Sequence, residues 1–431
     1  MSDLSDNIFQ MAEKYRDEAV TLLRRLIAVP ATSNQEGERL KLLKEAVERL
    51  GACDRCFFDS FGNFCWVVGQ GSRTIFFDGH IDTVGTGPMS DWEARGLDPF
   101  EGRYEKGEVW GRGAVDQLSG IVNQVFATKI MRELGLARSY TVYALATVAE
   151  ETNEGGGPRW IFAEGVRSNL YPRPEVVVLT EPTGDDKDGP LGIYRGHRGR
   201  LEIAIETYGR SAHASTPDLG KNAISAMAPI IQDITALQTG GQLVNDPVLG
   251  RGSIAISRIS DRSPSNNCVA PFCQIIVDRR LTFGESRTTA LAEILNMPSI
   301  RALGDKVRVN VLSYDEPTWT GYKVQNEASH PSWLTPEDSP AIRAAQSTYK
   351  AVLSPRAEST RYKGVFAKNP RLGCWSFSTD GVGVPRDVPV FGFSSGVEQL
   401  AHTVEERVDS REMIGAVAFL ALFPTMFIMQ N

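Results

Sequence analysis

Histidine and cysteine are scarce in this sequence, and it contains no long run of one charge. The 431 residues include five histidines and six cysteines, and the formal net charge is −7. Because nucleic-acid binding needs clustered Lys and Arg and the chain has no such run, we expect no nucleic-acid partner. So few cysteines in so long a chain are typical of reduced thiols rather than of a disulfide framework. We predict that Cys53 and Cys56, a lone Cys-x-x-Cys, are buried or incidental thiols.

Signals for export and for membrane insertion are also missing. The first six residues contain neither the basic nor the apolar region of a signal peptide. The apolar run 413–429 contains Pro424 and, at 17 residues, is shorter than a membrane span of ~20 residues. We therefore expect a cytoplasmic protein with a buried C-terminal helix and no membrane contact.

What the chain has is an ordinary globular composition and the length of two domains. Hydrophobic residues make up 42% of the sequence and charged residues 23%. A chain of 431 residues exceeds what one hydrophobic core usually serves, so we expect two domains.

Helices and strands alternate in the first part of the sequence. Apolar residues at helical spacing predict helices at 5–27, 36–50, 117–134 and 158–165. Short β-rich runs predict strands at 63–69, 74–79, 140–148 and 175–180. This alternation predicts an α/β domain with a mainly parallel sheet.

The pattern changes after the loop 185–190. Strands are predicted at 200–207, 252–260, 273–281 and 306–312, with a helix at 222–237. The first pattern returns with a helix at 340–353 and a strand at 389–393. We therefore predict a main domain formed by residues 1–197 and 317–431, interrupted by an inserted α+β domain of residues 198–316.

Two adjacent acids, Glu150 and Glu151, follow the apolar strand predicted at 140–148. Neighbouring carboxylates repel each other and cost desolvation at the end of a buried strand. Consecutive strand residues point to opposite faces, so one carboxylate is free to hold a metal while the other faces a substrate. The alternative is a solvated strand end with two ordinary surface acids.

Other acids and histidines also lie where predicted strands end, and open α/β sheets bind ligands beyond those ends. Imidazole and carboxylate together form a ligand set for borderline metals. Two ions about 3.5 to 4 Å apart need one bridging carboxylate and about two further protein ligands each. Asp116 as the bridge, His80 and Glu181 on one ion, and Glu151 and His402 on the other satisfy this count.

Two further acids remain for supporting roles. Asp82 lies two residues from His80 on the same strand face, where its carboxylate is placed to accept the other ring N–H. Glu150 is left without a ligand role, and a free carboxylate beside a metal site is what a general base requires.

Five motifs resemble the co-catalytic dinuclear zinc family that includes carboxypeptidase G, aminoacylase, acetylornithine deacetylase and succinyl-diaminopimelate desuccinylase. They are Gly79 to Val84, Gly111-Arg112-Gly113-x-x-Asp116, Glu150-Glu151, Thr180-Glu181-Pro182 and Ala401-His402-x-x-x-Glu406. Tyr194 to Arg200, Asp278 to Thr282 and Tyr314 to Gly321 are most similar to the family's branch linked to selenium metabolism. The sequence departs from the family at Val84-Gly85-Thr86-Gly87 and after His402, which leaves substrate preference open.

The resemblance implies two zinc ions, or Co²⁺ or Mn²⁺, and a small-molecule amide substrate. It implies that Asp116 bridges the ions, that Glu150 is the base, that Asp82 orients His80, and that the peptide bond Asp116–Gln117 is cis. The inserted domain resembles the family's lid and dimerisation domain, so we expect a homodimer. His213 lies in a motif whose histidine, in relatives, reaches into the partner subunit's site and stabilises the oxyanion.

The resemblance also implies substrate-binding residues. Arg280 and either Asn266 or Asn267 fall where relatives bind the substrate carboxylate, and a bidentate arginine suits that task. Ser378, Thr379 and Gly396 are expected to line the pocket and offer backbone donors. His197 and His330 match no ligand motif, and we interpret them as structural.

Together these features predict a metal-dependent hydrolase that cleaves an amide bond of an N-acyl amino acid, a short peptide or a related small molecule. One alternative is the same scaffold used for amide formation or another biosynthetic step, and another is a catalytically silent metal-binding protein. A dinucleotide enzyme is suggested only by Gly111-Arg112-Gly113, which lacks the rest of that fingerprint.

Overall fold

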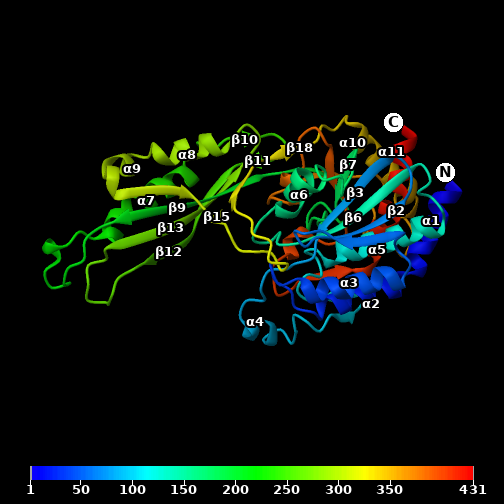
Figure 1. Cartoon of the computed structure of the whole chain (residues 1–431), viewed down its shortest axis with the longest axis horizontal. Helices are drawn as coiled ribbons and strands as arrows, with labels where there is room; N and C mark the ends of the chain where they lie inside the picture. Colours follow the sequence, from blue (N-terminus) through cyan, green and yellow to red (C-terminus); the bar gives the residue numbers. More distant parts are fainter. Residues whose placement is uncertain (1, 431) are drawn as a thin grey trace.

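The computed structural model describes residues 2–430 and shows a larger and a smaller domain that lie end to end (Figure 1). Both ends of the chain lie in the larger domain, on the right of Figure 1. The smaller domain is formed by the middle of the chain, drawn in green and yellow.

A nine-stranded sheet forms the centre of the larger domain. Its four central strands, in the order β6-β3-β7-β20, are parallel, and antiparallel strands flank them. The prediction of a mainly parallel central sheet is therefore confirmed. The strands, in sheet order, are β1 (Arg55–Phe58), β2 (Phe64–Gly69), β6 (Tyr140–Thr147), β3 (Arg73–His80), β7 (Val176–Leu179), β20 (Val390–Gly392), β8 (Ile193–His197) and β18 (Trp333–Leu334), with β19 (Leu372–Trp375) paired to β8.

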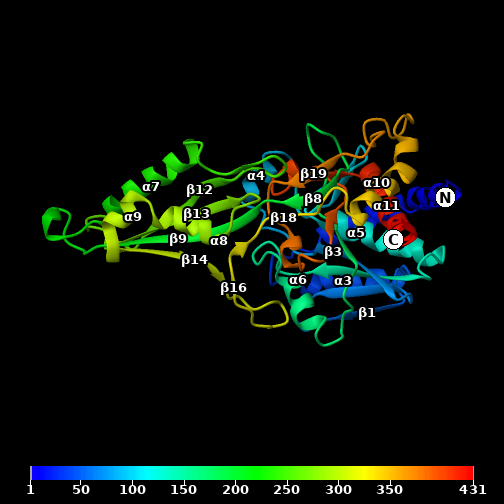
Figure 2. The same ribbon diagram turned by 90° about the horizontal axis from the view of Figure 1, so that it is seen from above.

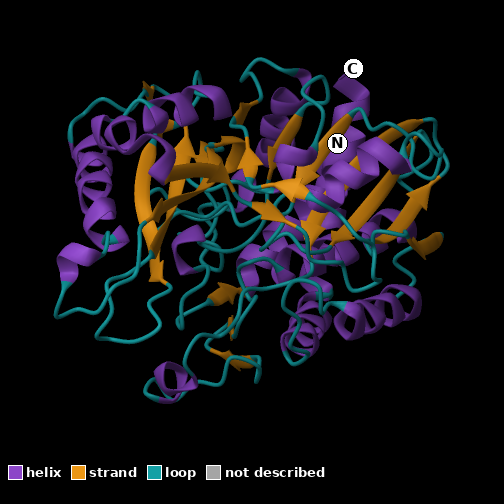
Figure 3. Cartoon of the chain, turned by 60° about the vertical axis from the view of Figure 1, so that its left-hand side comes forward, coloured by secondary structure: helices purple, strands orange, loops and turns teal. Residues whose placement is uncertain are grey.

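Helices pack against both faces of this sheet, because its central strands are apolar on both sides (Figure 3). The strand β3, for example, is buried from Thr74 to its end at His80. One face is covered by α1 (Ser2–Lys14), α2 (Arg16–Ile27), α3 (Gly37–Arg49), α5 (Leu118–Glu133), α10 (Pro340–Val352) and α11 (Ser410–Gln430). The other face is covered by α6 (Gly156–Trp160) and by a π-helix at Ile161–Gly165 that continues it.

The smaller domain is a five-stranded antiparallel sheet with helices on one face (Figure 2). Burial alternates along β13, which gives the sheet one core face. The strands are β12 (Ser253–Asp261), β13 (Phe272–Leu281), β9 (Gly199–Tyr208) and β14 (Val307–Val311), with β17 (Ser329–His330) also paired to β9. The helices are α7 (Ala223–Thr239), α8 (Arg287–Leu295) and α9 (Pro298–Leu303).

The chain passes between the two sheets at β8–β9 and again at β17–β18. Between β14 and β17 it first visits the larger domain, where the indole N–H of Trp319 donates to the carbonyl oxygen of Gly62. The predicted boundaries at 198 and 316 stay predictions for the extent of the inserted domain.

Short elements complete the chain. They are α4 (Met89–Glu93), the three-stranded sheet of β4 (Arg103–Glu105), β5 (Glu108–Trp110) and β21 (Arg407–Asp409), the pairs β10 (Asn245–Asp246) with β11 (Gly250–Arg251) and β15 (Ser313–Tyr314) with β16 (Asn326–Glu327), and 3₁₀ turns at Pro217–Leu219, Gly304–Lys306, Ser354–Arg356, Asp380–Gly383 and Glu398–Leu400.

The C-terminal helix α11 is the helix within residues 2–430 that is long and apolar enough to cross a membrane. Its most apolar 18-residue window is 78% buried inside the protein, where it packs against α1, α5 and α10. This agrees with the predicted buried C-terminal helix, because a core helix is as apolar as a membrane span.

Candidate metal centre

The candidate metal ligands follow three neighbouring parallel strands. β3 ends at His80, β7 ends just before Glu181, and β6 ends just before Glu150 and Glu151. In the register of the sheet His80 lies opposite Thr147, the last residue of β6. The carboxyl ends of these strands therefore bring the side chains to one edge of the sheet.

Helix α5 brings Asp116 to the same edge. A Cβ at Gly120 would lie 2.1 Å from the carbonyl oxygen of Thr180, so a glycine is required for this close approach. Glu406 holds the turn before the helix, since its Oε1 accepts the N–H of Asp116 at 3.1 Å and its Oε2 pairs with Arg112 at 2.6 Å. The peptide bond that follows Asp116 is cis, as the family resemblance implies.

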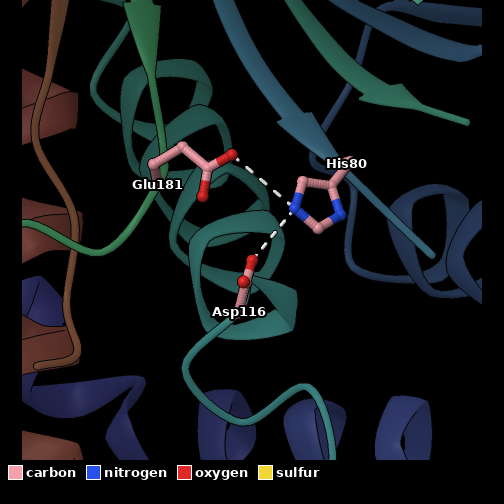
Figure 4. Close-up of side chains that lie close together, drawn as sticks. All are labelled: His80, Asp116 and Glu181. Atoms are coloured by element: carbon pink, nitrogen blue, oxygen red, sulfur yellow. Dashed lines mark hydrogen bonds and ion pairs between the residues drawn. The ribbon is translucent and has the colours of Figure 1, made fainter. Parts of the chain in front are cut away.

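Asp116 is shared between two groups of candidate ligands. In the first group, Nε2 of His80 lies 3.0 Å from Oδ1 of Asp116 and 3.6 Å from Oε1 of Glu181 (Figure 4). In the second, Nε2 of His402 lies 3.1 Å from Oδ2 of Asp116 and 3.2 Å from Oε2 of Glu151. The ligand atoms of each group lie within 4.8 Å of one another. The structure brings the five residues together in the pairing that the sequence predicts.

The donor set fits divalent cations. Burial raises the pKa of Glu150 and of Glu181 well above the usual value. Burial alone would lower the pKa of His80, but Glu150, Glu181 and Asp116 raise it well above the usual value. The Oε2 atom of Glu181 is buried and finds no hydrogen-bond partner within the described chain. Buried carboxylates that crowd two imidazoles carry negative charge that a borderline divalent cation would neutralise.

Glu150 lies beside the first group without belonging to it. Its Oε2 is 3.8 Å from Nε2 of His80, and its side chain is 7% exposed. It lines the same cavity as the candidate ligands. A carboxylate in this place is within reach of a water molecule at the ligands.

Asp82 does not hold His80 in the way that the sequence suggests. The nearest partner of the His80 Nδ1 is the main-chain carbonyl oxygen of Asp82 at 3.0 Å, whereas the carboxylate lies 3.6 Å away. The Asp82 carboxylate instead accepts the N–H groups of Glu150 at 3.2 Å and Glu151 at 3.1 Å, and the hydroxyl of Ser33 at 2.6 Å. The Asp82 carboxylate is therefore held by charge-assisted hydrogen bonds to the main chain of Glu150 and Glu151.

A cavity of about 430 Å³ opens onto both ligand groups. Residues of both domains line it, and the inserted domain contributes Arg200 and Arg280. The lining residues are His80, Val84, Asp116, Glu150, Glu151, Glu154, Glu181, Arg200, Arg280, Phe377, Ser378, Glu398, Ala401 and His402.

Arg280 lines this cavity as predicted, but its side chain already has a partner. Its Nε and one terminal nitrogen lie 2.7 and 3.2 Å from the two carboxylate oxygens of Asp278. Arg200 lies beside it and pairs with Glu154, Glu202 and Asp278. The inserted domain thus presents two arginines to the cavity, both held in place by carboxylates.

Of the three predicted backbone donors, Ser378 lines the cavity, and its hydroxyl donates to Glu154. Thr379 and Gly396 are not among the residues that line the cavity, which corrects the prediction for both. The N–H of Thr379 donates to Nδ1 of His197, and that of Gly396 to Glu412. These N–H groups are therefore engaged inside the protein.

His213, Asn266 and Asn267 lie at the opposite end of the inserted domain from the cavity. His213 pairs with Cys268 in the loop between β12 and β13. That loop precedes Phe272, the first residue of β13, whereas Arg280 is near the end of the strand at the cavity. At about 3.4 Å per residue, the strand separates these residues from their own cavity by more than ~20 Å. His213 is exposed, and its Nδ1 lies 2.6 Å from the Ser215 hydroxyl.

Four residues that line the cavity were not predicted from the sequence to contact a substrate. They are Glu154, Arg200, Phe377 and Glu398. Glu154 continues the acids at 150 and 151, and Glu398 precedes His402 by one helical turn. Both signals were present in the sequence. The place of Arg200 depends on how the two domains meet, and no local pattern records that.

All six cysteines are free thiols. Cys65 and Cys273 are buried, and Cys53 and Cys56 are half-buried. Burial raises the pKa of the Cys56 thiol to about 12, which makes it a poor nucleophile.

The sequence profile of peptidase family M20/M25/M40 matches residues 76–425. An uncharacterised protein of Escherichia coli (strain K12), YgeY, is 36% identical over 420 residues, which cover 97% of this chain and 96% of that protein. A succinyl-diaminopimelate desuccinylase of Paracoccus denitrificans is 26% identical, and the match covers 73% of this chain and 77% of that protein.

Solved structures show the same fold. The Bacillus subtilis protein YXEP, described as a dinuclear metal binding peptidase from the M20 family, superposes with a TM-score of 0.60. It is 14% identical, and the match covers 97% of this chain and 99% of that chain. The YXEP protein and this chain therefore share the two-domain architecture described above.

Proposed function

The chain belongs to peptidase family M20/M25/M40, a family of amide-cleaving metallo-enzymes, and from that premise we propose that it hydrolyses the amide bond of a small N-acyl amino acid or short peptide. The observation that carries the proposal is the pair of ligand groups that share Asp116, with Glu150 beside them in one cavity. No observation favours amide synthesis or a silent scaffold, since each of the five candidate ligands is in place.

Two divalent cations, with zinc as our proposal, fit the two groups. His80, Asp116 and Glu181 would hold one ion, and Asp116, Glu151 and His402 the other. When bound, such ions supply Lewis-acid activation of a water molecule and of the substrate carbonyl.

Glu150 is the general base in this proposal. Its carboxylate takes a proton from the attacking water while a C–O bond forms at the carbonyl carbon. When the C–N bond breaks, Glu150 returns the proton to the leaving nitrogen, so that an acid and an amine are released. Burial, which raises the pKa of Glu150, makes its protonated form easier to reach in the middle of this cycle.

The inserted domain completes the site in two ways. Arg280 is suited to a substrate carboxylate, and Ser378 lines the same cavity. His213 is exposed and distant from its own cavity, which supports a homodimer in which His213 of the partner subunit donates to the developing oxyanion. Asn266 or Asn267, in the β12–β13 loop whose Cys268 pairs with His213, would then enter the partner's cavity as well.

The direct test is Glu150→Gln. We expect the variant to keep two metal ions per chain and to lose turnover by about 10²–10⁴-fold, because only the proton transfer is removed. A panel of N-acyl amino acids and dipeptides, assayed for hydrolysis and for the reverse synthesis, first finds a substrate. The matched control is Glu164→Gln, since the side chain of Glu164 is 45% exposed and pairs only with Arg167. Retention of more than about a hundredth of the wild-type turnover would contradict the base role.

A further inference from the structure

The first turn of α3 contacts both loops that carry the candidate catalytic residues. Glu36 precedes the first residue of this helix, and Arg39 is its third residue. Both residues are fully buried. They lie outside the five motifs that the sequence relates to metal binding, and they do not line the cavity described above.

Glu36 holds the backbone immediately before Glu150. Its Oε1 accepts the N–H of Ala149 at 2.9 Å and the N–H of Asn34 at 2.8 Å. Ala149 has a φ of 62°, a left-handed conformation that is sterically unfavourable for an L-residue such as alanine. The contact with Glu36 stabilises this conformation, which sets the direction in which the chain enters Glu150 and Glu151.

Arg39 holds the other loop from the same helical turn. Its guanidinium donates to the carbonyl oxygen of Ile81 at 2.8 Å and to that of Val29 at 2.9 Å. Ile81 lies between His80 and Asp82. One turn of α3 therefore holds residues 80–82 through the guanidinium of Arg39 and residues 149–151 through the carboxyl group of Glu36.

The N–H groups around Ala149 are each accepted by a side chain from elsewhere in the protein. Asn63 accepts that of Val148 at 3.2 Å, and the Asp82 carboxylate accepts the next two after Ala149. The N–H groups of residues 148–151 are thus held by side-chain acceptors, while the carbonyl oxygen of Ala149 accepts the N–H of Asn153 at 2.8 Å. A loss of one acceptor leaves a buried N–H without a partner, which is unfavourable and loosens the segment.

We propose that Glu36 is a positioning residue of the metal centre, which holds Ala149 and so fixes Glu151 as a ligand and Glu150 as the base. The inference rests on the proposed metal centre and extends it to a residue outside the cavity. Residues that orient metal ligands from behind typically change metal affinity by about 10–100-fold when they are lost.

The test compares Glu36→Ala with Glu36→Gln. Glu36→Ala removes the oxygen that accepts the N–H of Ala149, whereas Glu36→Gln keeps an accepting oxygen in its place. The matched control is Asp233→Ala in the inserted domain, where the lost carboxylate also accepts a main-chain N–H, that of Ser299 at 3.1 Å. Glu36→Asp, whose carboxylate is too short to reach Ala149, replaces the alanine variant if that variant does not fold.

Two readouts are measured on each protein. Zinc titration against a chromophoric chelator gives the affinity of both ions, and hydrogen exchange of the metal-free protein gives the protection of residues 148–151. We expect Glu36→Ala to bind the ion assigned to Asp116, Glu151 and His402 about tenfold or more weakly. We also expect residues 148–151 of this variant to lose protection from hydrogen exchange. We expect Glu36→Gln and Asp233→Ala to match the wild type in both.

Wild-type zinc affinity together with wild-type protection in folded Glu36→Ala would overturn the inference, as would a glutamine variant as weak as the alanine variant. Failure of the proposed function would give a different result, because the wild-type protein itself would then bind fewer than two zinc ions. In that case the exchange of residues 148–151 in the metal-free proteins still decides whether Glu36 positions the segment.

Discussion

Asp116 is the residue that the two groups of candidate ligands have in common. Its Oδ1 faces His80 and its Oδ2 faces His402. Burial alone would raise the pKa of Asp116, but hydrogen bonds from the two histidines lower it well below the usual range. A carboxylate that stays ionised and turns one oxygen to each side is suited to bridge two cations.

A second residue-scale feature is the buried histidine His197, which predicts a loss of stability in acid. Thr379 N–H donates to Nδ1 of His197 at 2.8 Å, and burial lowers the pKa of His197 to about 3. The fold therefore favours the neutral ring. Its contribution is fully present above the unfolded pKa of about 6.5 and is lost as the pH falls toward 3.

We expect His197→Asn, whose amide oxygen can still accept the Thr379 N–H, to reduce this acid sensitivity. Between pH 7.5 and 5 the wild type should lose about 2 kcal/mol more than the variant. Thermal unfolding of both proteins across this range measures the difference. If the free energy of unfolding fell equally with pH in the two proteins, His197 would not be buried as a neutral ring.

At the residue scale, the sequence predicts what a strand end or a short motif determines. His80, Glu151 and Glu181 each follow a strand that is visible as an apolar run, so their convergence is predictable. The place of Arg200 in the cavity lining and the hydrogen bond made by the N–H of Gly396 were not predictable. Both depend on which distant segment packs against them, and that is recorded in tertiary contacts and not in local spacing.

At the element scale, α11 shows why an apolar helix is a poor membrane signal by itself. Phe419 in this helix is fully buried and stacks on Phe393 with ring centroids 3.7 Å apart. Phe391, in β20, contacts the same helix through Phe423. The apolar surface of α11 therefore faces the central sheet.

Phe419→Ala is expected to lower the free energy of unfolding by about 3–5 kcal/mol, because it opens a cavity in the main core. Met429→Ala is the matched control, since Met429 is 66% exposed at the end of the same helix. Calorimetric Tm values of the two variants check this. Equal Tm values would contradict the core assignment of α11.

Helix ends and breaks were the least predictable elements. The helix predicted over 5–27 is two helices, α1 and α2, that meet at Tyr15. The Tyr15 hydroxyl donates to Glu133 of α5 at 2.6 Å. Helix α1 packs mainly against α11, whereas α2 packs mainly against α5. The apolar spacing continues through the break because both helices bury the same side, so only tertiary packing shows where the first one ends.

At the scale of the whole molecule, the far end of the inserted domain is the surface that we assign to the proposed partner subunit. His213 lies at the far end of this domain, more than ~20 Å from its own cavity, and the edge strand β12 exposes Ile259 (57% exposed). The parallel sheet and the insertion were predictable from the change in strand pattern. The way in which the two domains share a cavity was not, because it depends on the path of the chain between β14 and β18.

If His213 acts in the partner's site, mixing two inactive variants should restore activity. Glu150→Gln keeps His213, and His213→Ala keeps Glu150, so each mixed dimer has one complete site. Equal mixing with subunit exchange should give about a quarter of the wild-type turnover, because half of the dimers are mixed and one of their two sites works. A mixture no more active than its parents, with mixed dimers confirmed by mass, would contradict the shared site.

The central claim is that the five ligands hold two metal ions, and diffraction from zinc-loaded crystals at the zinc absorption edge tests it most directly. The account predicts two anomalous peaks per chain, about 3.5 to 4 Å apart. One should lie between His80, Asp116 and Glu181, and the other between Asp116, Glu151 and His402. A single peak, or two peaks that Asp116 does not bridge, would contradict it.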